Sequence, residues 1–455
     1  MNESIFREYD IRGIAARDLT DAVAADVGRA VATRLGREGG TRLCLGRDVR
    51  ESSPRLQRAI AEGVRAAGLT AIDVGIVPTP VLYYSIVAAE ADGGIMITGS
   101  HNPIEYNGFK ICRGTSPIWG AEIRSLREQI QAEDFSAGAG TSENLDILPT
   151  YREMVVGRAV TGRPLRIVVD AGNGTAGIIA PQILEALGHT VLRLYCEPDG
   201  SFPHHLPDPT VPAYMRDLAQ RVQAEQADLG IGFDGDADRI GLVDERGRLL
   251  FGDQILALYA RELLARQPGS RVLFDVKCSQ GLEEEIRARG GEPVMWKTGH
   301  SLLKAKMHAD QIPLAGEMSG HMFFAEGYFG FDDAIYGAAR MAGYLSRQDE
   351  PLGAQVDSLA ISRYVNSPEV RVTCTDEAKF RIVEEMAQRF AERHEVIDID
   401  GARVVFEEGW GLLRASNTQP VLVMRFEARS PEGLARITER FREALADYPE
   451  VDWSD

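Results

Sequence analysis

Alternating apolar and polar runs divide the first three quarters of the chain into three similar units. Each unit begins with a short apolar run that predicts a strand, at residues 41–48, 165–172 and 270–277. An amphipathic helix is predicted next, at residues 54–68, 180–188 and 280–291, and a β-rich run follows each helix. This alternation predicts βαβ units around mostly parallel sheets.

The closing strand of each unit leads into a polar loop. These loops are "TGSHNP" (98–103), "GFDGDADR" (232–239) and "GEMSGH" (316–321). Ligands of open α/β sheets bind at the carboxyl ends of the strands. Because the three loops occupy equivalent places in the repeat, we expect three domains that face one central crevice.

The last quarter of the chain has a different pattern. From about residue 362, strand-like runs alternate with helices predicted at 376–393 and 431–446, which indicates a small α+β domain with an antiparallel sheet. Its polar loop is "RASNTQP" (414–420). The expected fold is α/β, with three similar mixed α/β domains (1–147, 148–249, 250–361) and a smaller C-terminal α+β domain (362–455) around a central cleft.

Composition narrows the classes of partner. The chain has 455 residues, 44% of them hydrophobic and 26% charged, which is typical of a globular protein. A formal net charge of −18 argues against nucleic-acid and anionic-membrane partners. Five widely spaced cysteines predict reduced thiols in a cytoplasmic protein, and neither a signal peptide nor a membrane-spanning apolar run is expected.

The loop "DGDADR" has the strongest chemical signal. Asp234, Asp236 and Asp238 alternate along it, and hard carboxylate oxygens from one tight loop suit Mg²⁺. An EF-hand calcium loop is the alternative, since Glu245 falls at its last ligand position. Arg239 replaces the glycine that such a loop needs, and the flanks look like strands, so a Mg²⁺ site is favoured.

Two other segments leave alternatives open. Ser100, after a buried apolar run, is either a nucleophile at a strand end or the cap of a helix. The run "GNGTAG" (172–177), with Glu197 about 20 residues further on, matches a dinucleotide fingerprint and keeps a nicotinamide-dependent enzyme open. Its place in the repeat equals that of "GRDVRES" and "VKCSQG", so its glycines also fit a simple strand-to-helix turn.

The remaining loops offer groups for a sugar and a phosphate. Glu317, Ser319 and His321 combine acceptors and donors that suit sugar hydroxyls. A guanidinium beside short polar side chains suits a phosphate, and "RASNTQP" supplies such a set. The residues of this set are Arg414, Ser416, Asn417 and Thr418, with Arg425 on the next strand. Lys110, Lys277 and His300 are predicted near strand ends.

Together these motifs resemble the α-D-phosphohexomutase family over nearly the whole chain. "FREYDIRG", "TGSHNP", "GFDGDADR", "GEMSGH" and "RASNTQP" occur in the family's order, and the chain looks most similar to the dual-specificity bacterial branch. The resemblance implies an enzyme that carries phosphate on Ser100. It also implies one Mg²⁺, bound by Asp234, Asp236, Asp238 and a phosphoserine oxygen.

The resemblance further implies a role for each matching residue. Tyr9, Arg12, His101 and Lys110 belong around the phosphoserine, with Arg239 near the metal. Glu317 and Ser319 contact sugar hydroxyls, with His300 and His321 close by. The phosphate that does not react is held by Arg414, Ser416, Asn417, Thr418 and Arg425, and Lys277 is assigned to the same substrate site.

The implied reaction is a phosphoryl transfer between C1 and C6 of a hexose. Mannose 1-phosphate and glucose 1-phosphate would become the 6-phosphates through a 1,6-bisphosphate, with glucose 1,6-bisphosphate as activator. Positioning and charge neutralisation are what such a transfer requires. His300, His321 and Lys110 are candidates for the general acid and base. Phosphoglucosamine mutase and a metal-dependent serine phosphatase are alternatives, and a monomer is expected.

Overall fold

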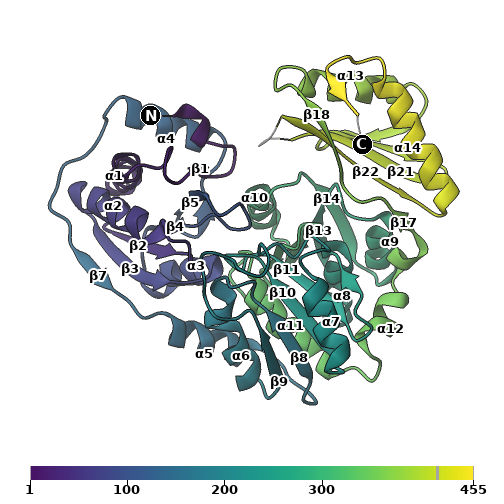
Figure 1. The fold of residues 1–455 in the computed structure, drawn as a ribbon, viewed down its shortest axis with the longest axis horizontal. Coiled ribbons are helices and arrows are strands. Elements are labelled where there is room, and N and C mark those ends of the chain that lie inside the picture. The colour runs from purple at the N-terminus through teal and green to yellow at the C-terminus, as the bar shows by residue number, and fades with distance from the viewer. Residues whose placement is uncertain (1, 417–419, 454–455) are drawn as a thin grey trace.

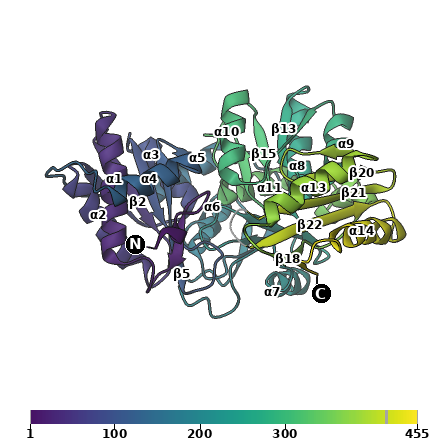
Figure 2. The same ribbon diagram turned by 90° about the horizontal axis from the view of Figure 1, so that it is seen from above.

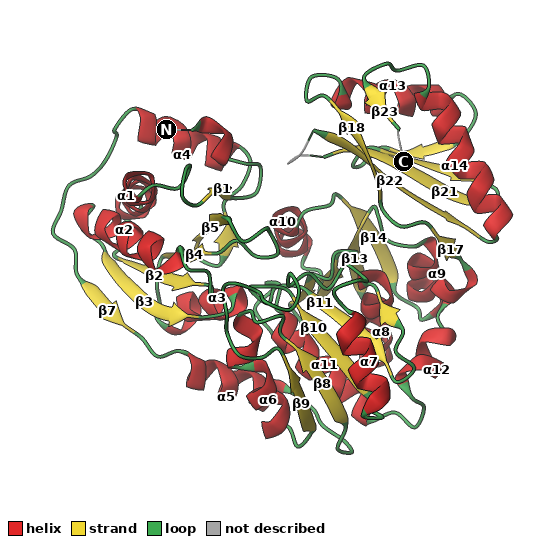
Figure 3. Ribbon diagram, in the orientation of Figure 1, coloured by secondary structure: helices red, strands yellow, loops and turns green. Residues whose placement is uncertain are grey.

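Four β-sheets, each with its own helices, form four structural units (Figures 1 and 3). The computed structural model describes residues 2–416 and 420–453. The first unit lies at one end of the molecule, the second and third pack together in the middle, and the fourth lies against the third (Figures 1 and 2). Within the described residues, no helix combines the length and apolar character needed to cross a membrane.

The first unit has a sheet in the order β1-β5-β4-β2-β3-β7, in which β2, β3, β4 and β7 are parallel. Its strands are β1 Ile11–Ile14, β2 Arg42–Arg47, β3 Thr70–Ile76, β4 Gly93–Ile97, β5 Tyr106–Arg113, β6 Ser116–Pro117 and β7 Ser142–Asn144. Its helices are η1 Glu3–Ile5, α1 Asp21–Arg37, α2 Ser53–Ala66, α3 Thr79–Ala88 and α4 Ala121–Gln131. Apolar residues of α1, α2 and α4, such as Val27, Ile60 and Leu126, form one core against this sheet.

The second unit has the sheet order β12-β11-β10-β8-β9, with β8 parallel to β9 and β10. Its strands are β8 Arg166–Asp170, β9 Thr190–Leu194, β10 Leu229–Phe233, β11 Ile240–Asp244 and β12 Leu249–Leu250. Its helices are α5 Leu148–Arg158, η2 Thr175–Ile178, α6 Ala180–Ala186 and α7 Arg216–Ala224. The helix predicted at 180–188 is therefore present as α6.

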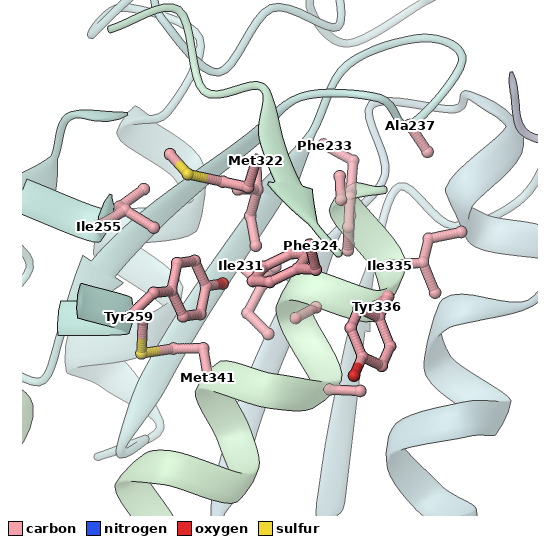
Figure 4. Packing of buried hydrophobic residues seen from close by; sticks show 14 of the residues in the cluster. Ile231, Phe233, Ala237, Ile255, Tyr259, Met322, Phe324, Ile335, Tyr336 and Met341 are labelled. Atoms are coloured by element: carbon pink, nitrogen blue, oxygen red, sulfur yellow. The ribbon is translucent and has the colours of Figure 1, made fainter. Parts of the chain in front are cut away.

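The third unit has the order β14-β13-β15-β16, with β13 parallel to both β14 and β15. Its strands are β13 Arg271–Asp275, β14 Glu292–Trp296, β15 Leu314–Gly316 and β16 Met322–Phe324. Its helices are α8 Gly252–Arg266, α9 Gln280–Ala288, α10 His300–Asp310, α11 Ala334–Ser346, α12 Leu352–Asp357 and η3 Ala360–Arg363. Figure 4 shows Ile231 and Phe233 of β10 close to Met322 and Phe324 of β16, so the second and third units share one core.

The fourth unit is an antiparallel sheet with two helices, as the sequence pattern predicts. The sheet order is β19-β20-β21-β22-β18-β23, and β17 pairs with β22. Its strands are β17 Val365–Asn366, β18 Val370–Cys374, β19 Glu395–Ile397, β20 Ala402–Phe406, β21 Gly409–Ala415, β22 Val421–Ala428 and β23 Val451–Asp452, and its helices are α13 Lys379–Ala391 and α14 Pro431–Leu445. Met386, Phe426 and Phe441 belong to a core of this unit alone, and Trp410 and Leu412 pack against Val276 of the third unit.

Each of the three predicted loops connects a parallel strand to an antiparallel return strand. Residues 98–105 join β4 to β5, residues 234–239 join β10 to β11, and residues 317–321 join β15 to β16. Two alternatives are therefore wrong. Ser100 caps no helix, because its loop leads directly into β5, and the acidic loop is not an EF-hand, because strands flank it.

Candidate active site

Ser100 is buried where the first and second units meet. The side chain is 3% exposed, and its Oγ donates a hydrogen bond to Asp234 Oδ2 at 2.8 Å. His101 Nδ1 lies 3.0 Å from the same Oγ. The Ser100 backbone has a φ of 48°, a left-handed conformation that is uncommon outside glycine. A Cβ on Gly235 would collide with the Ser100 carbonyl, so the two loops touch through their backbones.

The three aspartates converge in one fully buried group. Carboxylate oxygens of Asp234, Asp236 and Asp238 all lie within 4.8 Å of one another. Burial and the neighbouring carboxylates Asp238 and Asp236 raise the pKa of Asp234 well above its usual range. Within the described residues, Asp236 Oδ1 and Asp238 Oδ1 accept no hydrogen bond. Unpaired buried carboxylate oxygens in this arrangement fit a hard divalent cation.

Lys110, on β5 of the first unit, partly compensates the negative charge of the three aspartates. Its Nζ lies 2.6 Å from Asp236 Oδ2 and 2.5 Å from Asp238 Oδ2. Burial alone lowers the pKa of Lys110, but the attraction of both carboxylates outweighs it and the pKa is raised. Thr79, at the start of α3, donates to Asp236 Oδ2 at 2.5 Å. The acidic loop is thus bonded to the first unit through side chains of β5 and α3.

The third unit contributes two histidines that share one carboxylate. Arg239 Nε donates to His321 Nε2 at 3.0 Å, which leaves the proton of His321 on Nδ1, 2.9 Å from Asp332 Oδ2. His300 Nδ1 lies 3.9 Å from the same oxygen, and the two imidazoles are stacked with their centroids 5.3 Å apart. Burial and the charge of Lys304 lower the pKa of His300 well below its usual range, so His300 is neutral at pH 7.

His101 is the third imidazole of the site. Burial and the charge of Arg239 lower the pKa of His101 well below its usual range. A neutral imidazole can accept a proton from a hydroxyl, and His101 is within hydrogen-bonding distance of Ser100 Oγ. Arg12 on β1, also predicted for this site, is bound to Asp10 at 2.5 Å.

The loop "GEMSGH" contacts the turn before α10. Glu317 Oε1 accepts a hydrogen bond from Gly299 N at 2.6 Å, and Ser319 Oγ donates to Glu317 Oε2 at 3.1 Å. Tyr9 OH donates to Thr298 O at 3.3 Å, so the first unit reaches the same turn. These contacts bring Glu317, Ser319 and Tyr9 beside His300.

The predicted phosphate residues lie where the fourth unit meets the third. Arg414 Nη2 is 3.0 Å from Asp400 Oδ2, and Lys277 Nζ is 3.5 Å from a carboxylate oxygen of Glu369. Arg425 is buried at the same place, since its guanidinium donates to Lys277 O and its side chain is 6% exposed. Ser416, the residue after β21, is buried. Asn417 and Thr418 lie outside the described residues.

Four residues that the sequence analysis did not single out also reach this site. These residues are Thr79, Lys304, Asp332 and Arg50. Thr79 contacts Asp236, and Lys304 Nζ donates to Asp332 Oδ1 at 2.8 Å. Arg50 Nη2 donates to the carbonyl of Ser100 at 3.0 Å. Of the four, Arg50 has a sequence signal, because "GRDVRES" follows the first strand of its repeat. Lys304, Asp332 and Thr79 have none.

Comparison with known proteins identifies the family. Profiles of the phosphoglucomutase/phosphomannomutase family match four consecutive stretches: alpha/beta/alpha domain I at residues 3–137, domain II at 149–247, domain III at 251–361 and the C-terminal domain at 369–444. The chain therefore belongs to the phosphoglucomutase/phosphomannomutase family. It is accordingly an enzyme of the mutase type, an isomerase.

Individual relatives match over nearly their whole length. A phosphomannomutase/phosphoglucomutase from Pseudomonas aeruginosa is 48% identical over 444 residues, which cover 97% of this chain and 95% of the relative. A phosphoglucomutase from Neisseria gonorrhoeae is 41% identical over 458 residues, covering 100% and 99%. A solved phosphoglucomutase/phosphomannomutase family protein from Burkholderia thailandensis superposes with a TM-score of 0.93 at 41% identity, covering 99% of each chain.

Proposed function

We propose that this enzyme moves a phosphoryl group between C1 and C6 of mannose and glucose phosphates, with Ser100 as the carrier. The contact that supports this best joins Ser100 Oγ to Asp234 at 2.8 Å, inside a buried group of three carboxylates. A serine hydroxyl so close to a site for a divalent cation is suited to accept and release a phosphoryl group. The Pseudomonas relative is named for mannose and glucose phosphates and the Neisseria relative for glucose phosphates, and both fit this reaction.

Asp234, Asp236 and Asp238 would hold one Mg²⁺ together with an oxygen of phosphorylated Ser100. The unpaired oxygens Asp236 Oδ1 and Asp238 Oδ1 and the burial of all three carboxylates support this assignment. When bound, the ion would supply positive charge to the oxygens of the phosphoryl group during transfer. It would also neutralise the repulsion that raises the pKa of Asp234.

Side chains of three units would then surround the reacting phosphoryl group. Lys110, Arg239 and Arg12 supply positive charge, and such preorganised charge is the main requirement of phosphoryl transfer. Glu317 and Ser319 are assigned to sugar hydroxyls, where the neutral His300 can accept a proton. Asp332 orients His321 through the 2.9 Å contact to Nδ1. His300, His321 and Lys110 remain the candidates for the general acid and base.

A second phosphate site lets the same chemistry act at either end of the sugar. The phosphate that does not react is assigned to Arg414, Ser416, Arg425, Asn417 and Thr418, and Lys277 to the same substrate site. In the first half-reaction the phosphoserine gives its phosphoryl group to the free hydroxyl of the hexose phosphate, and the hydroxyl proton passes to a base. The resulting 1,6-bisphosphate turns over, and its other phosphate returns to Ser100.

Phosphorus NMR with two substrates tests this function. Wild-type protein with Mg²⁺ and a trace of glucose 1,6-bisphosphate should convert mannose 1-phosphate and glucose 1-phosphate to the 6-phosphates. Ser100→Ala should lose turnover, whereas Ser125→Ala, an exposed serine on α4, should keep it. Release of free sugar and inorganic phosphate by the wild type would instead indicate a serine phosphatase.

A further inference from the structure

The segment after the first strand of each unit lies beside the chemical loop of that unit. In all three units, the strand that opens the sequence repeat is the parallel neighbour of the strand that leads into the loop: β2 of β4, β8 of β10, and β13 of β15. The carboxyl ends of neighbouring parallel strands lie at the same edge of a sheet. The segments "GRDVRES", "GNGTAG" and "VKCSQG" are therefore placed to support the loops.

In the second and third units this support is modest. Thr175 donates from both its N and its Oγ1 to the Gly235 carbonyl, at 3.0 and 3.1 Å. In the third unit the contact comes from the residue just before the segment, since Asp275 Oδ1, at the end of β13, accepts a hydrogen bond from Met318 N at 3.3 Å. These contacts also assign a structural role to "GNGTAG", since its threonine holds the acidic loop.

In the first unit a single guanidinium holds the whole loop. Arg50 is 1% exposed, and its Nη1 donates to the carbonyls of Pro103 at 2.7 Å and Tyr106 at 3.0 Å. Its Nη2 donates to the carbonyls of Ser100 at 3.0 Å and Asn102 at 2.6 Å. Three carbonyl oxygens of the loop that contains Ser100, and that of Tyr106 at the start of β5, thus converge on one side chain.

Two further contacts fix the guanidinium itself. Asp48 Oδ2 lies 3.3 Å from Arg50 Nε. The same carboxylate oxygen accepts a hydrogen bond from Gly99 N at 2.9 Å. The guanidinium carbon of Arg50 lies over the ring of Phe202, a residue of the second unit, 5.2 Å from the ring centroid. A Cβ on Gly99 would collide with Arg50, so the loop passes directly over the guanidinium.

We propose that Arg50 is the positioning residue that sets Ser100 Oγ in place for phosphoryl transfer, an inference that rests on the proposed role of Ser100. The loop has no helix or strand of its own between β4 and β5, and Ser100 has a left-handed φ of 48°. The Arg50 contacts replace the missing regular hydrogen bonds. The guanidinium also neutralises the partial negative charge of four carbonyls close to the residue that receives a phosphate dianion.

Lysine cannot replace this arrangement. Its ammonium is a compact charge without the planar fork that lets Arg50 reach two carbonyls from each terminal nitrogen. A misplacement of a reacting group by about 1 Å can reduce a rate by about 100-fold. Arg50→Lys should therefore slow phosphorylation of Ser100 by about 10- to 100-fold, while the KM for hexose phosphate changes much less than kcat.

The test measures the rate at which Ser100 takes a phosphoryl group from glucose 1,6-bisphosphate. In this step a phosphorus–oxygen bond of the bisphosphate breaks, the bond to Ser100 Oγ forms, and the serine proton passes to the freed sugar oxygen. Quenched samples are analysed by intact mass. Arg29→Lys is the matched control, because Arg29 also donates to a loop carbonyl, that of Ser136, and lies 5.0 Å from the ring of Phe135.

Slow phosphorylation of Arg50→Lys with a normal rate for Arg29→Lys supports the proposal. An unchanged rate in Arg50→Lys, even with a lower melting temperature, would overturn it. If Arg50→Lys does not fold, Phe202→Leu is the milder variant, because it removes only the ring that lies against the Arg50 guanidinium. It should slow phosphorylation of Ser100 several-fold, and an unchanged rate would overturn the proposal as well. If the wild type itself never takes up phosphate on Ser100, the proposed function fails instead.

Discussion

Substitution of Lys110 tests the electrostatics of the acidic loop. Lys110→Met removes an ammonium that is within 2.6 Å of two buried carboxylates, so both carboxylates lose their lysine partner. Breaking a buried ion pair in this way costs roughly 3–5 kcal/mol. For a chain of 455 residues that unfolds as one unit, such a loss lowers the melting temperature by about 3–5 °C. We expect this destabilisation in EDTA, where no divalent cation can compensate.

The assay is thermal unfolding in EDTA and at increasing Mg²⁺, with Lys304→Met as the matched control. Lys304 is another buried lysine, paired with Asp332 at 2.8 Å rather than with the acidic loop. Both variants should melt early in EDTA, but Mg²⁺ should restore Lys110→Met more, because the ion and the ammonium neutralise the same oxygens. Equal stability of Lys110→Met and wild type in EDTA would refute this reasoning, as would equal gains of both variants from Mg²⁺.

Two further predictions concern other parts of the molecule. Burial raises the pKa of Asp333 from 3.8 to about 6, so the folded protein binds this proton more tightly than the unfolded chain does. The free energy of unfolding should therefore fall as the pH rises through this range, by roughly 3 kcal/mol in all. Denaturation at several pH values checks this, and the same slope in Asp333→Asn would contradict it. Arg414→Ala should raise the KM for hexose monophosphates by about 10- to 100-fold, since a charged hydrogen bond is worth roughly 1.5–3 kcal/mol. Steady-state kinetics measure this, and an unchanged KM would exclude Arg414 from the phosphate site.

The fold was largely predictable because its signals are local. The helices expected at 54–68 and 280–291 are α2 (53–66) and α9 (280–288), since amphipathic periodicity and terminal glycines mark such elements. The direction of the return strands β5, β11 and β16 was not predictable. An apolar run indicates a strand but not whether it pairs parallel or antiparallel.

The site was predictable where a motif is contiguous. Ser100, Asp234 and His321 all lie in short loops of unusual composition, and the contacts Ser100–Asp234 and Arg239–His321 confirm that the three loops meet. Arg50 and Asp332 were missed because their partners are distant in sequence or depend on the fold. Arg50, for example, is 50 residues from the loop carbonyl that it binds.

Intact-mass measurement tests the central claim most directly. Wild type and Ser100→Ala are incubated with Mg²⁺ and glucose 1,6-bisphosphate, and the modified peptide is mapped. We expect the wild type to gain the mass of one phosphoryl group on Ser100 and Ser100→Ala to gain none. A wild type that stays unmodified while it converts glucose 1-phosphate, or a phosphoryl group on another residue, would contradict the claim that Ser100 carries the phosphate.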